Sequence, residues 1–396
     1  ELANARMRPR APRLIMNYIS KEDKLRFDEC NFRGFYTVYR TVRRYPREVG
    51  GNLLGYVSEV NPDYLKRNPE YKTGDYVGMN GVESAYEPQL RGRKGVRIQE
   101  IDTHGAIKGS YMNGRYDSVP EPGRYLVSTI DARLQLLGEE LMRGKVGAAV
   151  AIEPSTGEIL MMVSSPTYDP DELVGRERGN NYMKMLGNKR QPLYNRAVRA
   201  KYPPGSTFKL ATMLTLLDDA RMPVSTVYDT HNGDPVTVGP ARNIRDSHRG
   251  DREIDFRRAV ASSSNVYFAK AIWDRYGSTG RKQEYSDFLH KELHLGQTVG
   301  LERLGERKPS VTTDWKVPDP GVMLVKMSYG YRVRLAPIQM ITFYNAIANG
   351  GKMISPVLVR ELRRGDRVEE RFESRTIASS IASRAALREV QQCLQA

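Results

Sequence analysis

The sequence predicts a β-rich N-terminal region followed by a longer domain of the α/β or α+β class. Three observations lead to this prediction. The stretch from Gly34 to Gly123 is rich in Gly, Tyr and turn residues and contains short runs of β-forming residues. Longer apolar and periodic segments follow from Tyr125 onward. The chain has 396 residues, which at about 150 residues per domain is enough for two or three domains.

Residues 1–36 show no sustained apolar period. A basic group at residues 6–10 is followed by mixed charges at residues 21–24. Because neither helix nor strand periodicity is present, we expect this segment to be extended or poorly ordered.

Short β-type runs occur next, at residues 36–39 and 53–57. Gly-containing turns are predicted at residues 74–75 and 80–81, and residues 120–123 hold two prolines and a glycine. We therefore predict a region of short strands and tight turns that ends near residue 123.

The second domain opens with a predicted helix at residues 134–142. Two apolar runs, residues 148–152 and 159–163, then flank a Pro- and Gly-containing turn at residues 153–158. Continuous apolar runs on both sides of a turn indicate a β-hairpin that is buried on both faces.

A further helix is predicted near the end of the chain. Met340, Phe343, Tyr344 and Ile347 follow the i, i+3, i+4, i+7 spacing of a helix face, and residues 349–351 supply a Gly-rich stop.

The composition excludes several classes of protein. Hydrophobic residues make up 39% of the chain and charged residues 28%, and no run approaches the roughly 20 apolar residues that span a bilayer, so a polytopic membrane protein is excluded. With only Cys30 and Cys393, a disulfide framework is excluded, and a Cys-based zinc site is disfavoured.

The net charge of +15 indicates an anionic partner or surface. Anionic lipid headgroups or an anionic polymer fit it as well as nucleic acid does. The arginines are scattered, and no nucleic-acid-binding motif is present, so we predict no nucleic-acid partner. A solvated basic surface is the simplest interpretation.

The segment at residues 202–210 carries the clearest chemical signal. Two prolines and a glycine precede Ser206, which is predicted to begin a helix with an apolar stripe at Leu210, Met213, Leu214 and Leu217. The i, i+3 spacing places the Lys209 amine beside the Ser206 hydroxyl. A desolvated lysine has a lowered pKa, and a neutral amine can accept the serine proton. The simpler alternative is an N-cap serine with a lysine that extends to the surface.

A second polar cluster, at residues 262–265, reads Ser-Ser-Ser-Asn. It interrupts two apolar-periodic segments at residues 256–260 and 266–269, which predicts a tight turn between helices. Such a turn can project a hydroxyl and an amide into a cleft. Taken alone, it is equally a turn with local side-chain to backbone hydrogen bonds.

Ser-x-x-Lys followed by Ser-x-Asn resembles the pattern of penicillin-binding proteins and serine β-lactamases. The surrounding motifs are similar to class B penicillin-binding proteins, and those before residue 60 look like the elongation-type members. The resemblance runs from about Phe35 to the end. Its motifs lie at residues 44–46, 54–57, 75–78, 81–83, 90–92, 165–170, 192–197, 202–207, 337–339 and 348–351.

The resemblance implies an α+β fold in two parts. An elongated β-rich pedestal of the dimerisation type would occupy residues 1–123. A penicillin-binding, serine β-lactamase-like transpeptidase domain, with a sheet flanked by helices, would occupy residues 124–396.

The implied activity is that of a serine D,D-transpeptidase that cross-links peptidoglycan stem peptides during cell-wall elongation and is acylated by β-lactams. By motif, Ser206 is the nucleophile and Lys209 its base. Ser263 is a proton shuttle, and Asn265 contacts the acyl-donor peptide. The backbone N–H of Ser206 would belong to the oxyanion hole. No cofactor or metal is implied.

The resemblance also implies partners and a location. The partners are stem peptides, β-lactam antibiotics and a SEDS-type membrane glycosyltransferase within the elongation complex. The location is the bacterial inner membrane, with a single-pass anchor and a periplasmic catalytic domain. Because the chain opens on Glu1 rather than Met, we expect the anchor to precede it.

One family motif is missing. A Lys-Thr-Gly strand is expected after residues 377–395, but the chain ends at Ala396, and the Lys-Thr-Gly at residues 72–74 precedes the serine, so we interpret it as coincidence. We expect the chain to stop before its final strands. One alternative is a catalytically silent scaffold that activates a membrane glycan polymerase. A second alternative is a β-lactam sensor or hydrolase, but such proteins do not carry a long pedestal of this kind.

Two further sets of polar residues could be read as metal ligands from the sequence. His290 and His294 lack the glutamate position of a zincin motif, and Asp246 and His248 lie in a polar loop without a matching ligand set. No metal site is predicted.

Overall fold

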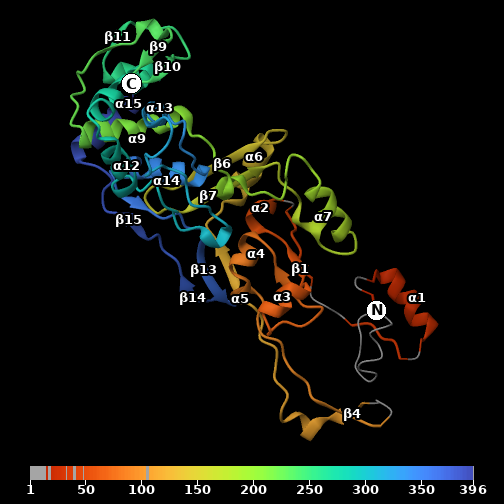
Figure 1. Ribbon diagram of the computed structural model, residues 1–396. Coiled ribbons are helices and arrows are strands. Elements are labelled where there is room, and N and C mark those ends of the chain that lie inside the picture. Colours follow the sequence, from red (N-terminus) through yellow and green to blue (C-terminus); the bar gives the residue numbers. More distant parts are fainter. Residues whose placement is uncertain are drawn as a thin grey trace. The chain divides into compact units, whose positions relative to one another are not determined.

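The computed structural model describes residues 15–16, 19–32, 34–38, 42–47, 49–103 and 107–395 (Figure 1). Contacts within the chain divide it into two compact units. Unit 1 comprises residues 1–127, 166–193 and 361–371, and unit 2 comprises residues 128–165, 194–360 and 372–396. Two segments from later in the chain therefore fold with the N-terminal part. The basic group at residues 6–10 lies outside the described residues.

Unit 1 is built from short helices and short strands. In chain order these are α1 (Lys21–Cys30), α2 (Gly51–Leu54), β1 (Val57–Glu59), α3 (Pro62–Arg67), β2 (Tyr76–Gly78), α4 (Gly81–Ala85), α5 (Glu87–Leu90), β3 (Gln99–Ile101), β4 (Ile107–Ser110), η2 (Tyr111–Gly114), η3 (Pro170–Leu173), α7 (Arg178–Leu186) and β14 (Arg367–Arg371). The strands β1–β2 and β3–β4 form two-stranded antiparallel sheets. Strands β5 (Tyr125–Ser128) and β13 (Val359–Arg364) join β14 in a three-stranded sheet.

Among the residues that the structure describes, unit 1 contains two small apolar clusters, besides further buried apolar side chains such as Leu53 and Val82. One is formed by Tyr56, Tyr168, Leu173 and Met185, and the other by Val60, Tyr71 and Val77. Neither cluster holds more than a few side chains, so polar contacts contribute to the interior as well.

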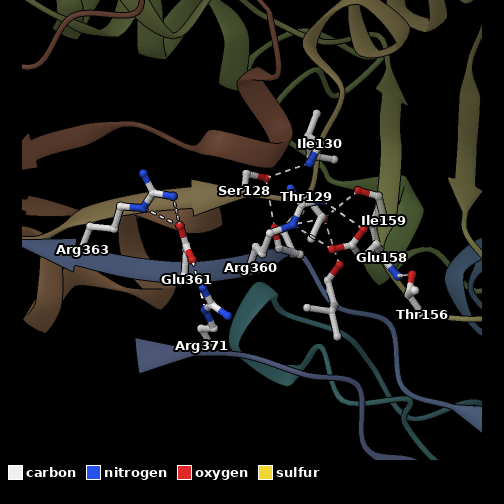
Figure 2. A network of polar contacts seen from close by, with 12 residues as sticks. Ser128, Thr129, Ile130, Thr156, Glu158, Ile159, Arg360, Glu361, Arg363 and Arg371 are labelled. Carbon is white, nitrogen blue, oxygen red and sulfur yellow. Dashed lines mark hydrogen bonds and ion pairs between the residues drawn. The ribbon is translucent and has the colours of Figure 1, made fainter. Parts of the chain in front are cut away.

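Three buried carboxylates in unit 1 each have direct partners. Glu83 forms an ion pair with Arg43, with a distance of 2.8 Å between Nε and Oε1. Glu87 accepts hydrogen bonds from the Tyr71 hydroxyl at 3.1 Å and the Gly78 N–H at 2.8 Å. Glu361 pairs with two arginines of the β13–β14 hairpin (Figure 2). A buried carboxylate needs an ion pair or hydrogen bonds: Glu83 and Glu361 have arginine partners, and Glu87 has two hydrogen bonds.

Helix α1 differs from the extended or poorly ordered segment expected for residues 1–36. Ser20 accepts a hydrogen bond from the Asp23 N–H at 2.9 Å and caps the helix. Lys24 and Asp28 form an ion pair at i, i+4. No residue of α1 is buried. The helix therefore depends on capping and charge pairs rather than on an apolar face, and apolar periodicity could not reveal it.

The predicted β-type runs are also corrected. Residues 36–38 form no strand, and residue 39 lies outside the described residues. In the run at residues 53–57, Leu53 and Leu54 lie in helix α2, and a strand begins only at Val57. Gly50 and Gly55, at φ 78° and 86°, bracket this helical turn. Glycine permits these left-handed conformations and so breaks the run into a helix and a strand.

The β3–β4 hairpin belongs to a longer two-stranded ribbon at residues 93–121. Isolated bridges pair Arg93 with Glu121 and Val96 with Ser118. All residues of β3 and β4 are exposed. A two-stranded ribbon with both faces in water is marginally stable by itself.

Unit 2 contains most of the helices. In chain order its elements are α6 (Ala132–Leu141), β6 (Gly147–Ile152), β7 (Ile159–Ser165), α8 (Arg196–Arg199), η4 (Gly205–Phe208), α9 (Lys209–Leu214), η5 (Thr215–Asp219), β8 (Tyr228–Asp229), η6 (His231–Gly233), β9 (Val236–Val238), β10 (Ala241–Ile244), β11 (Glu253–Ile254), α10 (Phe256–Ala261), α11 (Asn265–Ile272), η7 (Trp273–Gly277), α12 (Lys282–Lys291), η8 (Glu302–Leu304), α13 (Pro320–Met327), α14 (Pro337–Ala348), β12 (Met353–Ile354), β15 (Thr376–Ala378) and α15 (Arg384–Gln395). The mixed helix and strand content confirms the predicted α+β class. In the described part of the chain, no helix is long and apolar enough to span a membrane.

The predicted hairpin is present as β6 and β7, paired antiparallel from Gly147–Ser165 to Ile152–Ile159. Its expected burial on both faces is wrong for β6, whose residues are all partly exposed, whereas most of β7 is buried. The difference arises because helix α6 packs against β7. Helix α6, at the predicted position, covers β7: the Gln135 side chain exchanges two hydrogen bonds with the backbone of Met162.

The predicted helix ending at residues 349–351 is also present, as α14. Its C-cap is Asn349.

Helix α9 lies at the centre of the main apolar core. All six of its residues are buried. Side chains of α10, α11, α12, α13, α14 and α15 belong to the same cluster. The predicted stripe at Leu210, Met213 and Leu214 is part of it. The helix is thus enclosed rather than amphipathic, and any polar side chain on it is removed from water.

A network of polar contacts in unit 2 ties the start of β7 to residues 357–360 (Figure 2). The Thr129 hydroxyl is 2.7 Å from the Ile159 carbonyl and 3.0 Å from the Val357 carbonyl. Arg360 forms a bidentate ion pair with Glu158, at 2.8 and 3.0 Å. These contacts fix the edge of the β6–β7 hairpin.

Candidate active site

Ser206 lies in the first turn of a continuous helical segment formed by η4, α9 and η5. The backbone groups of Tyr202 and Leu335 exchange two hydrogen bonds of 3.0 Å, which anchor the chain just before this segment. The Tyr344 hydroxyl donates to the Thr207 carbonyl at 2.8 Å. Ser206 is exposed, although it precedes a helix whose residues are all buried.

Gly330 approaches the same turn closely. The Gly205 N–H donates to the Gly330 carbonyl at 3.1 Å. A Cβ atom on Gly330 would lie 2.0 Å from the Gly205 carbonyl oxygen, and the φ of Gly330 is 82°. A side chain at this position would therefore displace the turn that carries Ser206.

Lys209 is the buried cation of the site. Its relative exposure is 4%. The Nζ atom lies 3.3 Å from Ser206 Oγ and 3.0 Å from Ser263 Oγ, and it also donates to the Ser263 carbonyl. The Phe268 ring centroid is 5.9 Å away. All three hydrogen-bonding partners are uncharged oxygen atoms.

Burial lowers the pKa of Lys209 to about 8, and the negative charge of Asp246 opposes the shift. A lysine with this pKa is partly neutral near pH 7, so its amine can accept a proton from the Ser206 hydroxyl. Surface lysines remain protonated and cannot do so. The geometry therefore supports the base chemistry considered from the sequence.

The polar cluster at residues 262–265 forms the turn between α10 and α11, as predicted. Ser263 adopts φ 52°, in the left-handed region that serine rarely enters. Ser264 is buried and caps α11 by accepting a hydrogen bond from the Tyr267 N–H at 3.0 Å. The turn thereby presents Ser263 toward Lys209.

The structure brings together three of the four predicted site residues: Ser206, Lys209 and Ser263. Asn265 lies on the same turn, but its side-chain amide donates to the Arg245 carbonyl at 2.9 Å rather than to the other three. Beside it is a cavity of about 470 Å³, lined by Asn243, Ile244, Arg245, Asp246, Ser247, Asn265 and Tyr329. Asn265 therefore faces a space that a ligand could enter.

Asp246 was missed as a site residue by the sequence reasoning, which placed it in a polar loop. Its carboxylate accepts hydrogen bonds from the Ser264 hydroxyl and from the N–H groups of Asn265 and Val266. No spacing relative to residues 262–265 signals this contact, since it depends on the fold of the loop that follows β10.

The Lys-Thr-Gly at residues 72–74 belongs to unit 1. It forms the turn before β2, where the Lys72 N–H donates to the Asp75 carboxylate at 2.9 Å. Among the described residues there is no group of three or more His, Cys, Asp and Glu side chains that could hold a metal ion.

A serine at a helix start, with a buried lysine three residues later and a second serine across from it, is typical of serine acyl-transferases. Residues 147–396 match the model of the penicillin binding protein transpeptidase domain, and residues 3–128 match that of the penicillin-binding protein dimerisation domain. The chain belongs to the penicillin-binding protein family.

Its relatives agree with this assignment. It is 28% identical over 374 residues to the peptidoglycan D,D-transpeptidase MrdA of Salmonella typhimurium strain LT2, covering 88% of this chain and 57% of that protein. It is 26% identical over 359 residues to penicillin-binding protein 3 of Bacillus subtilis, covering 86% and 49%. The chain thus spans about half the length of the curated relatives it matches.

A solved structure is similar over most of the chain. The crystal structure of Pseudomonas aeruginosa PBP2 in complex with WCK 5153 matches with a TM-score of 0.72 and 26% identity, covering 91% of this chain and 75% of that one. The resemblance to class B penicillin-binding proteins of the PBP2 type, noted from the motifs, is confirmed.

Proposed function

We propose that the protein is a serine D,D-transpeptidase that cross-links peptidoglycan stem peptides during cell-wall elongation and is acylated by β-lactams. The observation that carries the proposal is the buried Lys209 amine, 3.3 Å from the Ser206 hydroxyl and 3.0 Å from the Ser263 hydroxyl. The names of the relatives support the substrate class.

In the proposed reaction, the neutral Lys209 amine takes the proton of Ser206 as the serine oxygen attacks the carbonyl carbon of the terminal D-Ala-D-Ala bond. The tetrahedral intermediate places its negative charge near the Ser206 N–H. As the bond breaks, Ser263 relays a proton from Lys209 to the leaving amine. An amine of a second stem peptide then attacks the acyl-enzyme and restores Ser206.

Asn265 is proposed to contact the acyl-donor peptide. It borders the 470 Å³ cavity, and its Nδ2 atom already donates to the Arg245 carbonyl. That hydrogen bond orients the amide group and leaves its oxygen as the acceptor for a peptide N–H.

The first experiment is acylation by a labelled penicillin, using the protein expressed from its complete reading frame. The parent is expected to form a stable adduct and the variant Ser206→Ala none. Ser262→Ala is the matched control, because the Ser262 hydroxyl bonds only to the Arg258 carbonyl of its own helix among the contacts described. Labelling that persists in Ser206→Ala contradicts the assignment. An unlabelled parent leaves the silent scaffold as the better account.

The domain roles are part of the same proposal. Residues 124–396 would be the transpeptidase domain, located in the periplasm and held at the bacterial inner membrane by a single-pass anchor. Residues 1–123 would be the pedestal, which binds a SEDS-type glycosyltransferase of the elongation complex.

The ribbon at residues 93–121 supports such a binding role. Its exposed apolar side chains include Val96, Ile98, Ile101, Ile107, Met112 and Tyr116, each at least 40% exposed. Exposed apolar groups concentrated on one segment commonly mark an interaction surface. A partner would also stabilise a ribbon that is marginal in water.

The ribbon is tested by the double variant Ile101→Ser with Ile107→Ser. It is expected to keep the parent's penicillin acylation rate and to co-purify less glycosyltransferase. Lys108→Ser, on the same strand, is the control and should keep both properties. Unchanged co-purification of the double variant would show that the ribbon is not the binding surface.

A further inference from the structure

Asp246 lies in the loop after β10 and is half-buried. Its Oδ2 atom accepts a hydrogen bond from the Ser264 hydroxyl at 2.7 Å. Its Oδ1 atom accepts two more, from the N–H of Asn265 at 2.5 Å and the N–H of Val266 at 2.9 Å. One carboxylate thus holds three consecutive residues.

These three donors sit where the α10–α11 turn enters α11. Backbone N–H groups in the first turn of a helix have no partner within the helix, and Asp246 satisfies two of them. Its charge also suits the positive end of the helix dipole. The contact with Ser264 adds a side chain that already caps the helix.

The residue immediately before this anchor is Ser263, which supplies two of the three oxygen atoms around the Lys209 amine. Ser263 holds an unfavourable backbone conformation, with φ 52°. Such conformations persist where the surrounding contacts enforce them. Without the carboxylate, the turn is free to relax and to withdraw Ser263 from Lys209.

We propose that Asp246 is a positioning residue, whose carboxylate locks the Ser263–Asn265 turn in the conformation that places Ser263 against Lys209. The expected effect on the acylation rate rests on the proposed transpeptidase function. The three hydrogen bonds that Asp246 accepts, called the frame below, do not depend on that function.

Asp246 acts on Lys209 in a second, separable way through its charge. Lys209 is faced by Ser206 from its own helix segment, by Ser263 from the turn and by the Phe268 ring from α11, all uncharged. The charge of Asp246 raises the pKa of Lys209 against the effect of burial. Removing the charge lowers that pKa, so the midpoint of the pH–rate profile moves to lower pH.

The two effects are separated by two variants. Asp246→Asn keeps an oxygen that can accept both backbone N–H groups but removes the charge. Asp246→Ala removes both. Asp234→Ala is the matched control, because Asp234 precedes β9 and pairs only with the exposed Arg249 among the contacts described.

The experiment measures the second-order rate constant of acylation by a labelled penicillin against pH, per folded protein. Asp246→Ala is expected to lose about 10²-fold, the scale of a misplaced catalytic group. Asp246→Asn should keep most of the parent's rate. The midpoint of its pH–rate profile should lie at lower pH than the parent's. Asp234→Ala should stay within about twofold of the parent, as a surface substitution does.

Several results would overturn the inference. One is a folded Asp246→Ala variant whose acylation rate constant lies within threefold of the parent's. If Asp246→Ala does not fold, Asp246→Asn decides: its oxygen keeps the acceptor for both N–H groups, so a loss of about 10²-fold in its acylation rate overturns the inference. If the parent itself is not acylated, the proposed function fails, and amide hydrogen exchange decides. Faster exchange at Asn265 and Val266 in Asp246→Ala than in Asp234→Ala then supports the frame, and equal exchange overturns it.

Discussion

Two buried carboxylates of unit 1 and the buried lysine of unit 2 differ in their partners. In unit 1, the buried Glu83 and Glu361 each lie against arginines, so each charge is compensated. In unit 2, the buried Lys209 meets only hydroxyl and carbonyl oxygens in hydrogen-bonding contact. The ion pairs hold Glu83 and Glu361 in place, whereas Lys209 has no ion-pair partner within hydrogen-bonding distance among the described residues, and its pKa is lowered by burial to about 8.

The difference follows from how each unit is packed. In unit 1, the described apolar clusters are small, and arginine side chains reach the buried carboxylates Glu83 and Glu361. Unit 2 encloses α9 in one large cluster of side chains from several helices. Burial in this cluster is the main cause of the lowered pKa of Lys209. In the proposed function, the large core of unit 2 therefore serves the chemistry as well as the stability of the protein.

The largest expected effect comes from Lys209→Arg. The guanidinium stays protonated near neutral pH, so it keeps the charge but cannot act as a base. Loss of a general base costs about 10²–10⁴ in rate. The measurement is the acylation rate constant with a labelled penicillin. A rate within a few-fold of the parent would show that Lys209 is a structural cation, like the arginines of unit 1.

A smaller effect is expected from pH. With a pKa of about 8 for Lys209, the neutral fraction of its amine rises about tenfold between pH 7 and pH 9. The acylation rate should rise by the same factor, because the neutral form is the base. Rates corrected for penicillin hydrolysis in buffer test this. A flat profile contradicts a titrating amine in the rate-determining step.

The smallest effect is expected in unit 1, from Glu83→Gln. The substitution keeps an acceptor for the Tyr45 hydroxyl but removes the ion pair with Arg43. Because Arg43 is 43% exposed, we expect a loss of only about 1 kcal/mol in the free energy of unfolding, and an unchanged acylation rate. Urea unfolding measures the first. Glu70→Gln, at an exposed pair with Arg91, is the control and should change neither. A slower acylation in Glu83→Gln would contradict the separation of roles.

The sequence predicted those parts that depend on local patterns. The helix with Ser206 and Lys209, the turn at residues 262–265 and the β6–β7 hairpin follow from apolar periodicity and turn residues, and all are present. Helix α1 was not predicted, because charges and a cap form it without an apolar face. Asp246 was not predicted either, because its role arises from a contact between segments that no spacing encodes.

The most direct test of the account is the position of the acyl group after reaction with a β-lactam. Mass spectrometry of the digested adduct measures it residue by residue. The account predicts a single acylated residue, Ser206, on the peptide that also carries Thr207 and Phe208. An acyl group on Ser263, on any other residue, or on none would contradict the claim that the buried Lys209 activates Ser206.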